Sequence, residues 1–161
     1  MRGEARFLPV PGIIDSARAA KVLLQDSNVS NTLALFEEVT LALVGVGTLE
    51  PSSLVASSGN IFLKRGIGIA SKSRAVEDIC LRFYDSKGRA IRGSLNDRVI
   101  GMTLDGLRQV RRSVAICGGK EKFPAILGAV RGQWINTLTL VTDQHTAQRL
   151  AKAQTGKGTA A

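Results

Sequence analysis

The sequence contains few of the residues that bind metals, form disulfides or act as nucleophile and base. Its 161 residues include a single histidine, His145, and two cysteines, Cys80 and Cys117, which lie far apart and form no C-x-x-C pair. Zinc sites and disulfide frameworks need closely spaced ligands, and a serine triad needs a histidine beside its nucleophile. We therefore expect no metal site, no cofactor and no catalytic residue. Both cysteines are expected to be small core residues, and His145 a surface residue.

Long apolar runs and aromatic side chains are also scarce. No stretch approaches the roughly 18 apolar residues of a membrane span, and the segment MRGEARFLPVPG carries charges and prolines where a signal peptide needs an apolar run. We therefore expect a cytoplasmic protein with no membrane partner. Aromatic residues make up 4% of the chain and are scattered, which argues against a platform for stacking single-stranded bases.

The net charge of +9 is concentrated in the later part of the chain. Residues 1–60 hold four basic and six acidic side chains, whereas residues 61–161 hold 18 basic and seven acidic ones. A basic surface attracts nucleic acid, anionic membranes or phosphorylated ligands, and composition does not choose among them. Direct nucleic-acid binding is therefore one hypothesis, and its signature is an affinity that falls steeply with salt.

Helical and strand-like patterns alternate along the chain, whose length and 44% hydrophobic content suit one folded domain. Apolar spacing predicts helices at about 17–24 and 27–36, after Met102, at 123–130 and after Asp143. Strands are predicted at 41–46, 75–84, 98–102, 113–117 and 137–141, with a turn at 85–88 and a hairpin return over 89–93. The unbroken apolar run at 41–46 indicates a strand buried on both faces. The alternation predicts an α/β fold with a mostly parallel sheet and an inserted antiparallel hairpin.

Glycines mark the ends of two of these strands, where open α/β sheets bind their ligands. The candidate residues are Gly45, Val46 and Gly47 after the first strand, and Gly118, Gly119, Lys120 and Lys122 before the helix at 123–130. Glycine lets a ligand approach the backbone, and a helix start favours an anion by about 0.3–1 kcal/mol. The two lysines add charge, so a phosphate or carboxylate site is predicted there. An ordinary turn is the alternative, because neither segment contains a complete nucleotide-binding motif.

Asp78 is a third candidate, because it is an acid within a strand otherwise rich in core residues. A buried carboxylate needs hydrogen-bond donors, which sugar hydroxyls or protein amides supply. A salt bridge to Arg74 or Arg98 is the alternative. If the protein were an enzyme, Asp78 and Glu77 would be the only nearby bases.

Several segments in order resemble the later part of the sugar-binding effector domain of SorC-type bacterial transcriptional regulators. They are LALVGVG, AVEDICLRFYDSKGR, LNDRVIGMTLDGLRQV, VAICGGKEKFPAILGAVRG and VTDQHTAQRLA, and the resemblance runs from about Leu8 to Ala151. It implies a Rossmann-like domain, related to sugar-phosphate isomerases and glucosamine-phosphate deaminases, that senses a phosphorylated sugar without turnover. It further implies that Gly45–Gly47 form the family's glycine-rich strand end, that Asp78 holds sugar hydroxyls and that Lys122 meets a phosphate. Glu77 stands where the family has a glycine.

The resemblance also implies how the chain is organised. Residues 1–153 are expected to form part of an effector domain, followed by a disordered tail at 154–161. The family's helix-turn-helix and the first part of its effector domain have no counterpart here, so DNA contact is expected only through that absent element. Strand edges left open in a partial sheet favour a homo-oligomer. The alternatives are an isomerase- or deaminase-like enzyme and a truncated remnant that binds nothing.

Overall fold

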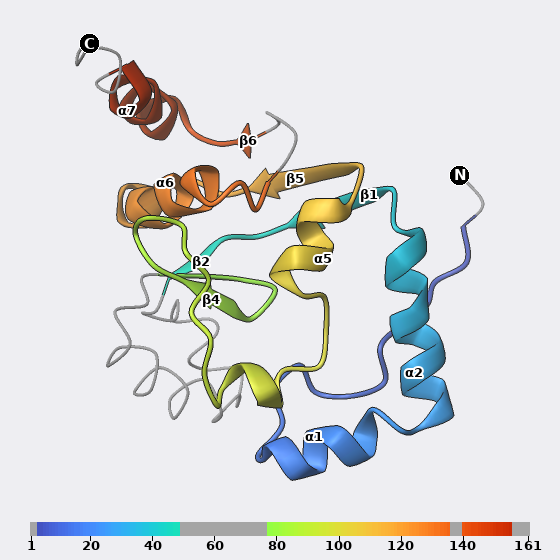
Figure 1. The fold of residues 1–161 in the computed structure, drawn as a ribbon. Helices are drawn as coiled ribbons and strands as arrows, with labels where there is room; N and C mark the ends of the chain where they lie inside the picture. Colours follow the sequence, from blue (N-terminus) through green and yellow to red (C-terminus); the bar gives the residue numbers. More distant parts are fainter. Residues whose placement is uncertain (1–2, 49–76, 136–139, 156–161) are drawn as a thin grey trace.

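The computed structural model describes residues 3–48, 77–135 and 140–155. Its helices are α1 (Ala17–Leu23), α2 (Ser27–Ala34), α5 (Leu104–Gln109), α6 (Phe123–Arg131) and α7 (Gln144–Thr155), with 3-10 turns η1 (Leu35–Glu38), η2 (Asn96–Arg98) and η3 (Lys120–Lys122). Its strands are β1 (Leu41–Val44), β2 (Gly47–Thr48), β3 (Glu77–Ile79), β4 (Arg82–Tyr84), β5 (Arg112–Ile116) and β6 (Leu140–Val141). In Figure 1 the strands lie between α1 and α2 at the lower right and α7 at the upper left. Among the described residues, no helix is long and apolar enough to cross a membrane.

The main sheet is parallel, with strand order β1-β5-β6. Leu41 pairs with Arg112 and Val44 with Ala115, while Ala115 also pairs with Leu140. The chain from β1 to β5 passes through β2, β3, β4 and α5, and the chain from β5 to β6 passes through α6, so that each strand runs in the same direction. This arrangement confirms the predicted mixed α/β, Rossmann-like fold.

The first strand is buried on one face only, contrary to the prediction for 41–46. It ends at Val44, and Ala42 and Val44 pack against the main core. Leu41 and Leu43 are 49% and 65% exposed, and Ile116, which the β1–β5 register places on the same face, is 55% exposed. An apolar run indicates that a strand needs cover on both faces, but it does not show which element supplies that cover.

Residues 77–84 form a hairpin rather than part of one continuous strand, which corrects the prediction for 75–84. β3 and β4 are antiparallel, and Cys80 and Leu81 form the turn with φ values of +54° and +62°. A two-residue turn with both φ values positive usually carries Asn-Gly. Because Cys80 and Leu81 give no such signal, the alternating pattern indicates an uninterrupted strand. β2 completes this small sheet by pairing with β3.

The strand predicted at 98–102 is absent. Its backbone is held by the guanidinium of Arg82, which donates to the carbonyls of Asn96, Val99, Gly101 and Met102. Only one bridge forms there, between Val99 and Ile13. The segment is therefore a loop tied to β4 rather than a member of a sheet.

The predicted helices and the turn at 85–88 agree with the structure where it describes them, whereas the hairpin return and the start of the tail agree only in part. Ser16, Asp26 and Thr103 cap α1, α2 and α5 through side-chain oxygens, as residues of these types do at helix starts. The turn at 85–88 is present, whereas the return over 89–93 is limited to one bridge. Residues 137–139 and 156–161 lie outside the described residues, and α7 continues to Thr155, past the expected start of the tail.

Tyr84 joins the small sheet to the main core. Its side chain is fully buried, and its hydroxyl donates to the carbonyl of Ala125 in α6 at 3.0 Å. Gly128 lies against the ring, because a Cβ there would sit 3.0 Å from Tyr84 Cε2. This contact fixes β3 and β4 relative to the start of α6.

We expect Tyr84→Phe to lower the free energy of unfolding by about 0.5–1.5 kcal/mol, because it removes one buried hydrogen bond while keeping the ring. Urea unfolding followed by far-UV circular dichroism measures this change. An unchanged unfolding midpoint would show that the Tyr84–Ala125 bond does not hold the two sheets together.

Candidate functional site

Lys122 links the carboxyl ends of the neighbouring parallel strands β1 and β5, which carry two of the predicted candidate segments. Lys122 follows β5 in η3, is half-buried, and donates from Nζ to the carbonyl oxygen of Val46 at 3.2 Å. Its own amide donates to the carbonyl of Gly119 at 3.1 Å. The lysine therefore links the Gly45–Gly47 segment to the Gly118–Gly119 segment.

Asp78 lies beside this link. β2 pairs with β3 so that Gly47 stands opposite Asp78, and a Cβ on Gly47 would come within 3.1 Å of Asp78 Cγ. A side chain at position 47 would displace the Asp78 carboxylate from this position. Asp78 Oδ2 accepts the Leu81 N–H at 3.1 Å. Burial raises the pKa of Asp78, and the Leu81 hydrogen bond and the positive charge of Lys122 oppose this rise.

The two cysteine thiols near these residues are held in the neutral form. Burial raises the pKa of Cys117 to about 11, with the charge of Lys122 acting in the opposite direction. Burial and the charge of Asp78 likewise raise the pKa of Cys80. A thiol with a raised pKa is a poor nucleophile at neutral pH. Cys117 is buried as predicted, whereas Cys80 is only partly buried at the hairpin turn.

The glycine pair after β5 binds a carboxylate of the chain itself, whereas the prediction assigned it to an anionic ligand. The Gly119 N–H donates to Asp143 Oδ2 at 2.8 Å, so the chain's own carboxylate takes an amide that was expected to meet an anion. The side chain of Glu121 also lies over Gly119, where a Cβ would come 3.0 Å from Glu121 Cδ. Gly119 has φ of +109°, a conformation that favours glycine. Lys120 is exposed.

Asp143 and Thr142, at the carboxyl end of β6, are the site residues that the sequence analysis missed. The sequence predicts Asp143 only as the residue at which the last helix starts, and Asp143 does accept the Thr146 amide there at 2.9 Å. Hydrogen bonds from the Thr146 hydroxyl, the Thr146 amide and the Gly119 amide lower the pKa of Asp143. The buried Thr142 hydroxyl has no hydrogen-bond partner among the described groups and lies near Gly118. The order of parallel strands was the signal, because β6 ends at the same edge as β5.

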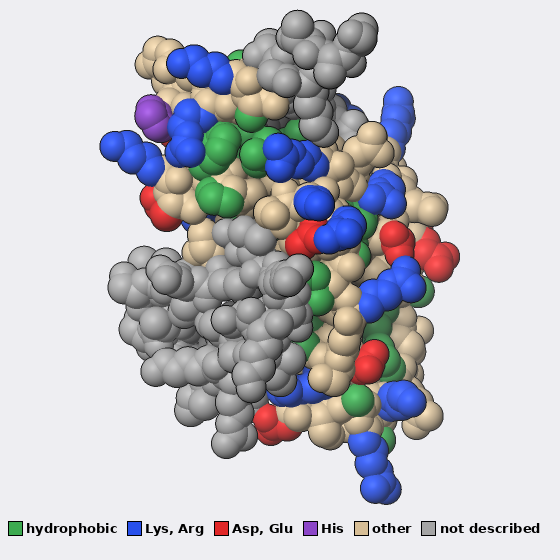
Figure 2. Space-filling model, turned by 60° about the vertical axis from the view of Figure 1, so that its left-hand side comes forward, with side chains coloured by type: hydrophobic (Ala, Val, Ile, Leu, Met, Phe, Trp, Pro, Cys, Tyr) green, Lys and Arg blue, Asp and Glu red, His purple; other side chains and the backbone are tan. Residues whose placement is uncertain are grey.

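The start of α6 is held by a cation on α7. Phe123 directly follows Lys122, and the Arg149 guanidinium lies 3.8 Å from the centre of the Phe123 ring. In Figure 2, Lys and Arg side chains outnumber acidic ones on the face that shows the histidine.

The structure thus brings together most of the predicted site. Asp78, Lys122 and Gly45–Gly47 form one cluster, with Gly118 and Gly119 next to it. Among the described residues, Asp78 forms no ion pair, and Arg98 instead donates to the carbonyl of Ile14 at 2.6 Å. Arg74 lies outside the described residues. In the described part, no group of three or more His, Cys, Asp or Glu is arranged to hold a metal.

A parallel sheet with a cation and a carboxylate at its carboxyl edge defines an α/β ligand-binding domain. The family described as "Putative sugar-binding domain" matches residues 1–152, and the chain belongs to this family of sugar-binding domains of SorC-type transcriptional regulators.

Named relatives are transcriptional regulators. The chain is 34% identical over 145 residues to the deoxyribonucleoside regulator of Bacillus subtilis, covering 90% of this chain and 45% of that protein. It is 29% identical over 153 residues to the sorbitol operon regulator of Klebsiella pneumoniae, covering 94% and 47%. The crystal structure of that full-length regulator has a TM-score of 0.77 at 28% identity, covering 87% of this chain and 44% of that chain. The chain therefore spans about half the length of these curated relatives.

We expect the thermal stability of the protein to fall as pH drops below about 4, partly through Asp143. Its pKa is lower in the folded than in the unfolded chain, so its ionised form stabilises the fold above the ordinary carboxyl pKa, and protonation removes this effect. Asp143→Asn should unfold at a lower temperature than the wild type at pH 7 and lose less on acidification. The melting temperatures of both proteins should be measured from pH 7 to pH 3. If they differ by the same amount at every pH, Asp143 does not have this role.

Proposed function

We propose that residues 1–153 form part of an effector-binding domain that binds a phosphorylated sugar without turnover and thereby controls the DNA binding of a transcriptional regulator. The observation that carries the proposal is the proximity of Lys122 and Asp78, without an ion pair between them, beside the carboxyl ends of β1 and β5. A phosphorylated sugar needs a cation for its phosphate and hydrogen-bond acceptors for its hydroxyls. The family membership supports the sugar, and the local chemistry supports the phosphate.

Lys122 supplies the phosphate contact in this proposal. An ammonium has three N–H donors, and the Val46 carbonyl takes one of them, which leaves donors for an anion. The Gly119 amide is already bonded to Asp143, so it adds no donor unless that bond breaks. The side-chain charge of Lys122 therefore contributes more to anion binding than the backbone at the helix start, which reverses the weight given to the glycine pair by the sequence alone.

Asp78 supplies the sugar contact. Its Oδ2 accepts the Leu81 amide, and the remaining lone pairs are suited to sugar hydroxyls. The unpartnered Thr142 hydroxyl near Gly118 offers a further donor and acceptor at the same edge. A bound hydroxyl would satisfy this buried group, whose lack of a partner otherwise costs about 1–3 kcal/mol.

Binding without turnover fits the neutral thiols, whereas the raised pKa of Asp78 also suits a general base. General base catalysis requires a base with a pKa matched to its task and a proton within reach. Asp78 is held by the Leu81 amide, and both thiols are neutral at pH 7. We propose that Asp78 orients the sugar rather than abstracting a proton. An enzyme of the isomerase or deaminase type is the alternative, and it would also depend on Asp78.

The exposed face of the main sheet supports the proposal that this chain is one part of a larger effector domain. Leu41, Leu43 and Ile116 form an apolar row on a parallel sheet, a type of sheet that is normally covered on both faces. The curated relatives are about twice as long as the part that matches. Further polypeptide laid on this face would also close the site at the end of β1.

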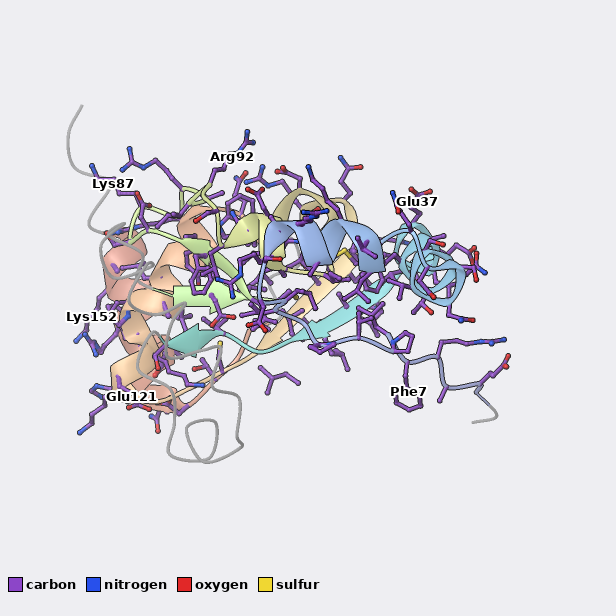
Figure 3. All side chains as sticks on the ribbon, turned by 90° about the horizontal axis from the view of Figure 1, so that it is seen from below. Phe7, Glu37, Lys87, Arg92, Glu121 and Lys152 are labelled. Atoms are coloured by element: carbon purple, nitrogen blue, oxygen red, sulfur yellow. The ribbon has the colours of Figure 1, made fainter. Side chains whose placement is uncertain are left out.

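We expect Lys122→Met to remove the phosphate contact. Differential scanning fluorimetry with a panel of pentose and hexose phosphates should show a saturable rise in melting temperature for the wild type, and NMR should recover the sugar phosphate unchanged. The variant should bind about 5–150-fold more weakly, because a charge-assisted hydrogen bond contributes about 1–3 kcal/mol. Lys87→Met, which changes an exposed lysine on a remote turn, is the matched control (Figure 3). Equal losses in both variants, or no shift with any sugar phosphate, would contradict the proposal.

Asp78→Asn should separate sugar binding from phosphate binding. The variant is expected to lose most of its response to sugar phosphates and to keep the response to inorganic phosphate, because Lys122 is unchanged. Without ligand, its melting temperature at pH 7 should equal or exceed that of the wild type, since a neutral amide avoids the cost of burying a charge. A lower melting temperature with intact sugar binding would show that Asp78 is a structural residue.

A further inference from the structure

Two carboxylates of the chain lie at Gly119, beside the proposed phosphate contact. Asp143 Oδ2 accepts the Gly119 N–H at 2.8 Å. The Glu121 side chain lies over the same residue, since a Cβ on Gly119 would come 3.0 Å from Glu121 Cδ. Gly119 and Lys122 belong to one turn, in which the Lys122 amide donates to the Gly119 carbonyl at 3.1 Å. A phosphate bound by Lys122 therefore meets carboxylates that the chain itself supplies.

The Asp143 carboxylate takes the amide that an anionic ligand would use. A carboxylate oxygen and a phosphate oxygen accept the same backbone N–H groups, and Gly119 has no side chain to exclude either of them. Asp143 directly precedes α7 and is exposed, whereas Gly119 follows β5. The carboxylate can therefore turn towards solvent without moving β5. The Gly119 amide is a donor that either the chain or a ligand can use.

Displacing Asp143 from Gly119 breaks one hydrogen bond and leaves two. Asp143 also accepts the Thr146 amide at 2.9 Å and the Thr146 hydroxyl at 2.7 Å, and both donors lie in the first turn of its own helix. Because these donors remain, the carboxylate keeps partners when it leaves Gly119, and α7 keeps its start. A contact that one ligand group can replace at the cost of one hydrogen bond is suited to reversible competition.

A buried hydroxyl next to this contact supports the entry of a ligand group here. Thr142 Oγ1 is buried and has no hydrogen-bond partner among the described groups. It lies near Gly118, because a Cβ on Gly118 would come 3.6 Å from Thr142 Oγ1 and 2.8 Å from Asp143 Oδ2. A phosphate oxygen that replaces the Asp143 carboxylate would also meet the Thr142 hydroxyl, and the bond would satisfy a group that proteins rarely leave unpartnered.

We propose that Asp143 is a built-in competitor of the phosphate group: its carboxylate binds the Gly119 amide, and the phosphate of a bound sugar displaces it. This inference rests on the proposed sugar-phosphate site. Competition lowers the affinity for every phosphate ligand by the same factor. A ligand that Asp78 also holds through its sugar therefore stays bound at concentrations at which inorganic phosphate does not. Asp143 thus sets the affinity of the site and makes binding depend on the sugar contacts.

The binding of inorganic phosphate and of a panel of pentose and hexose phosphates tests the proposal. Asp143→Ser removes the carboxylate but keeps a side chain that caps helices well, so α7 should still start at this residue. Isothermal titration calorimetry at constant ionic strength should show that the variant binds both kinds of ligand about fivefold or more tightly than the wild type, because the Gly119 amide becomes available to the phosphate. The affinity for the unphosphorylated sugars should not change.

Asp26→Ser is the matched control. Asp26 caps α2 as Asp143 caps α7, since its Oδ1 accepts the Asn28 amide at 2.8 Å, and α2 lies away from α7 in Figure 1. Each substitution removes one negative charge and changes one cap, so each should lower the melting temperature measured without ligand. Asp143→Ser alone should bind phosphate more tightly. A loss of stability together with a gain in affinity indicates competition, because a purely structural residue does not produce that combination.

The outcomes separate this inference from the proposed function. If the wild type binds sugar phosphates and Asp143→Ser binds them equally or more weakly, the inference is wrong and the sugar-phosphate site stands. Binding by the variant alone supports the inference, because the carboxylate then blocks the site completely. No binding by either protein overturns both.

A second variant covers the case in which Asp143→Ser does not fold, as judged by circular dichroism. Asp143→Asn removes the charge and keeps a capping side chain, so it should bind inorganic phosphate about threefold or more tightly than the wild type, because the repulsion between two anions is gone. An unchanged affinity in this variant would reject the competition.

Discussion

The hydrogen bond from Lys122 Nζ to the Val46 carbonyl is the interaction on which the rest of the site depends. It joins the segment after β5 to the segment after β1 and places a cation beside the half-buried Asp78. The charge of Lys122 partly compensates the burial of that carboxylate, and Gly47 gives it space. Without the lysine, Asp78 would keep the Leu81 amide as its one partner among the described residues, and a buried charge with so little compensation is unfavourable.

The sequence is sufficient to predict the fold class and most helices, because these depend on local spacing and caps. Ser16, Asp26 and Thr103 stand where the helices begin, and the apolar spacing indicates α6, although its fully buried residues are Ala125, Ile126, Gly128 and Ala129. The sequence also selects two strand ends as candidates for ligand binding, since glycines follow β1 and glycines and lysines follow β5. The candidate residues Asp78 and Lys122 are brought together as that pattern suggests.

The errors share one physical cause, which is that they depend on contacts between segments distant in the sequence. The positive φ values of Cys80 and Leu81 are maintained by pairing on both sides of the turn, not by the turn residues. The backbone at 96–102 is held by the Arg82 guanidinium, which lies 14 to 20 residues earlier in the sequence. Asp143 reaches the Gly119 amide only because β6 lies beside β5. No local sequence pattern indicates these partners.

The two site carboxylates act on stability in opposite directions, and this difference separates a binding group from a structural one. Asp143 has a lowered pKa, so its ionisation stabilises the fold as pH rises through the carboxyl range. Asp78 has a raised pKa, so the folded chain holds its proton more tightly and loses stability as pH rises above the ordinary value. A carboxylate kept at a cost to the fold needs a compensating partner, and a ligand hydroxyl or cation supplies it when bound. Asp143 already has such partners in Thr146 and Gly119, whereas Asp78 and the Thr142 hydroxyl, which has no partner among the described groups, are the groups that a ligand would satisfy in the proposed site.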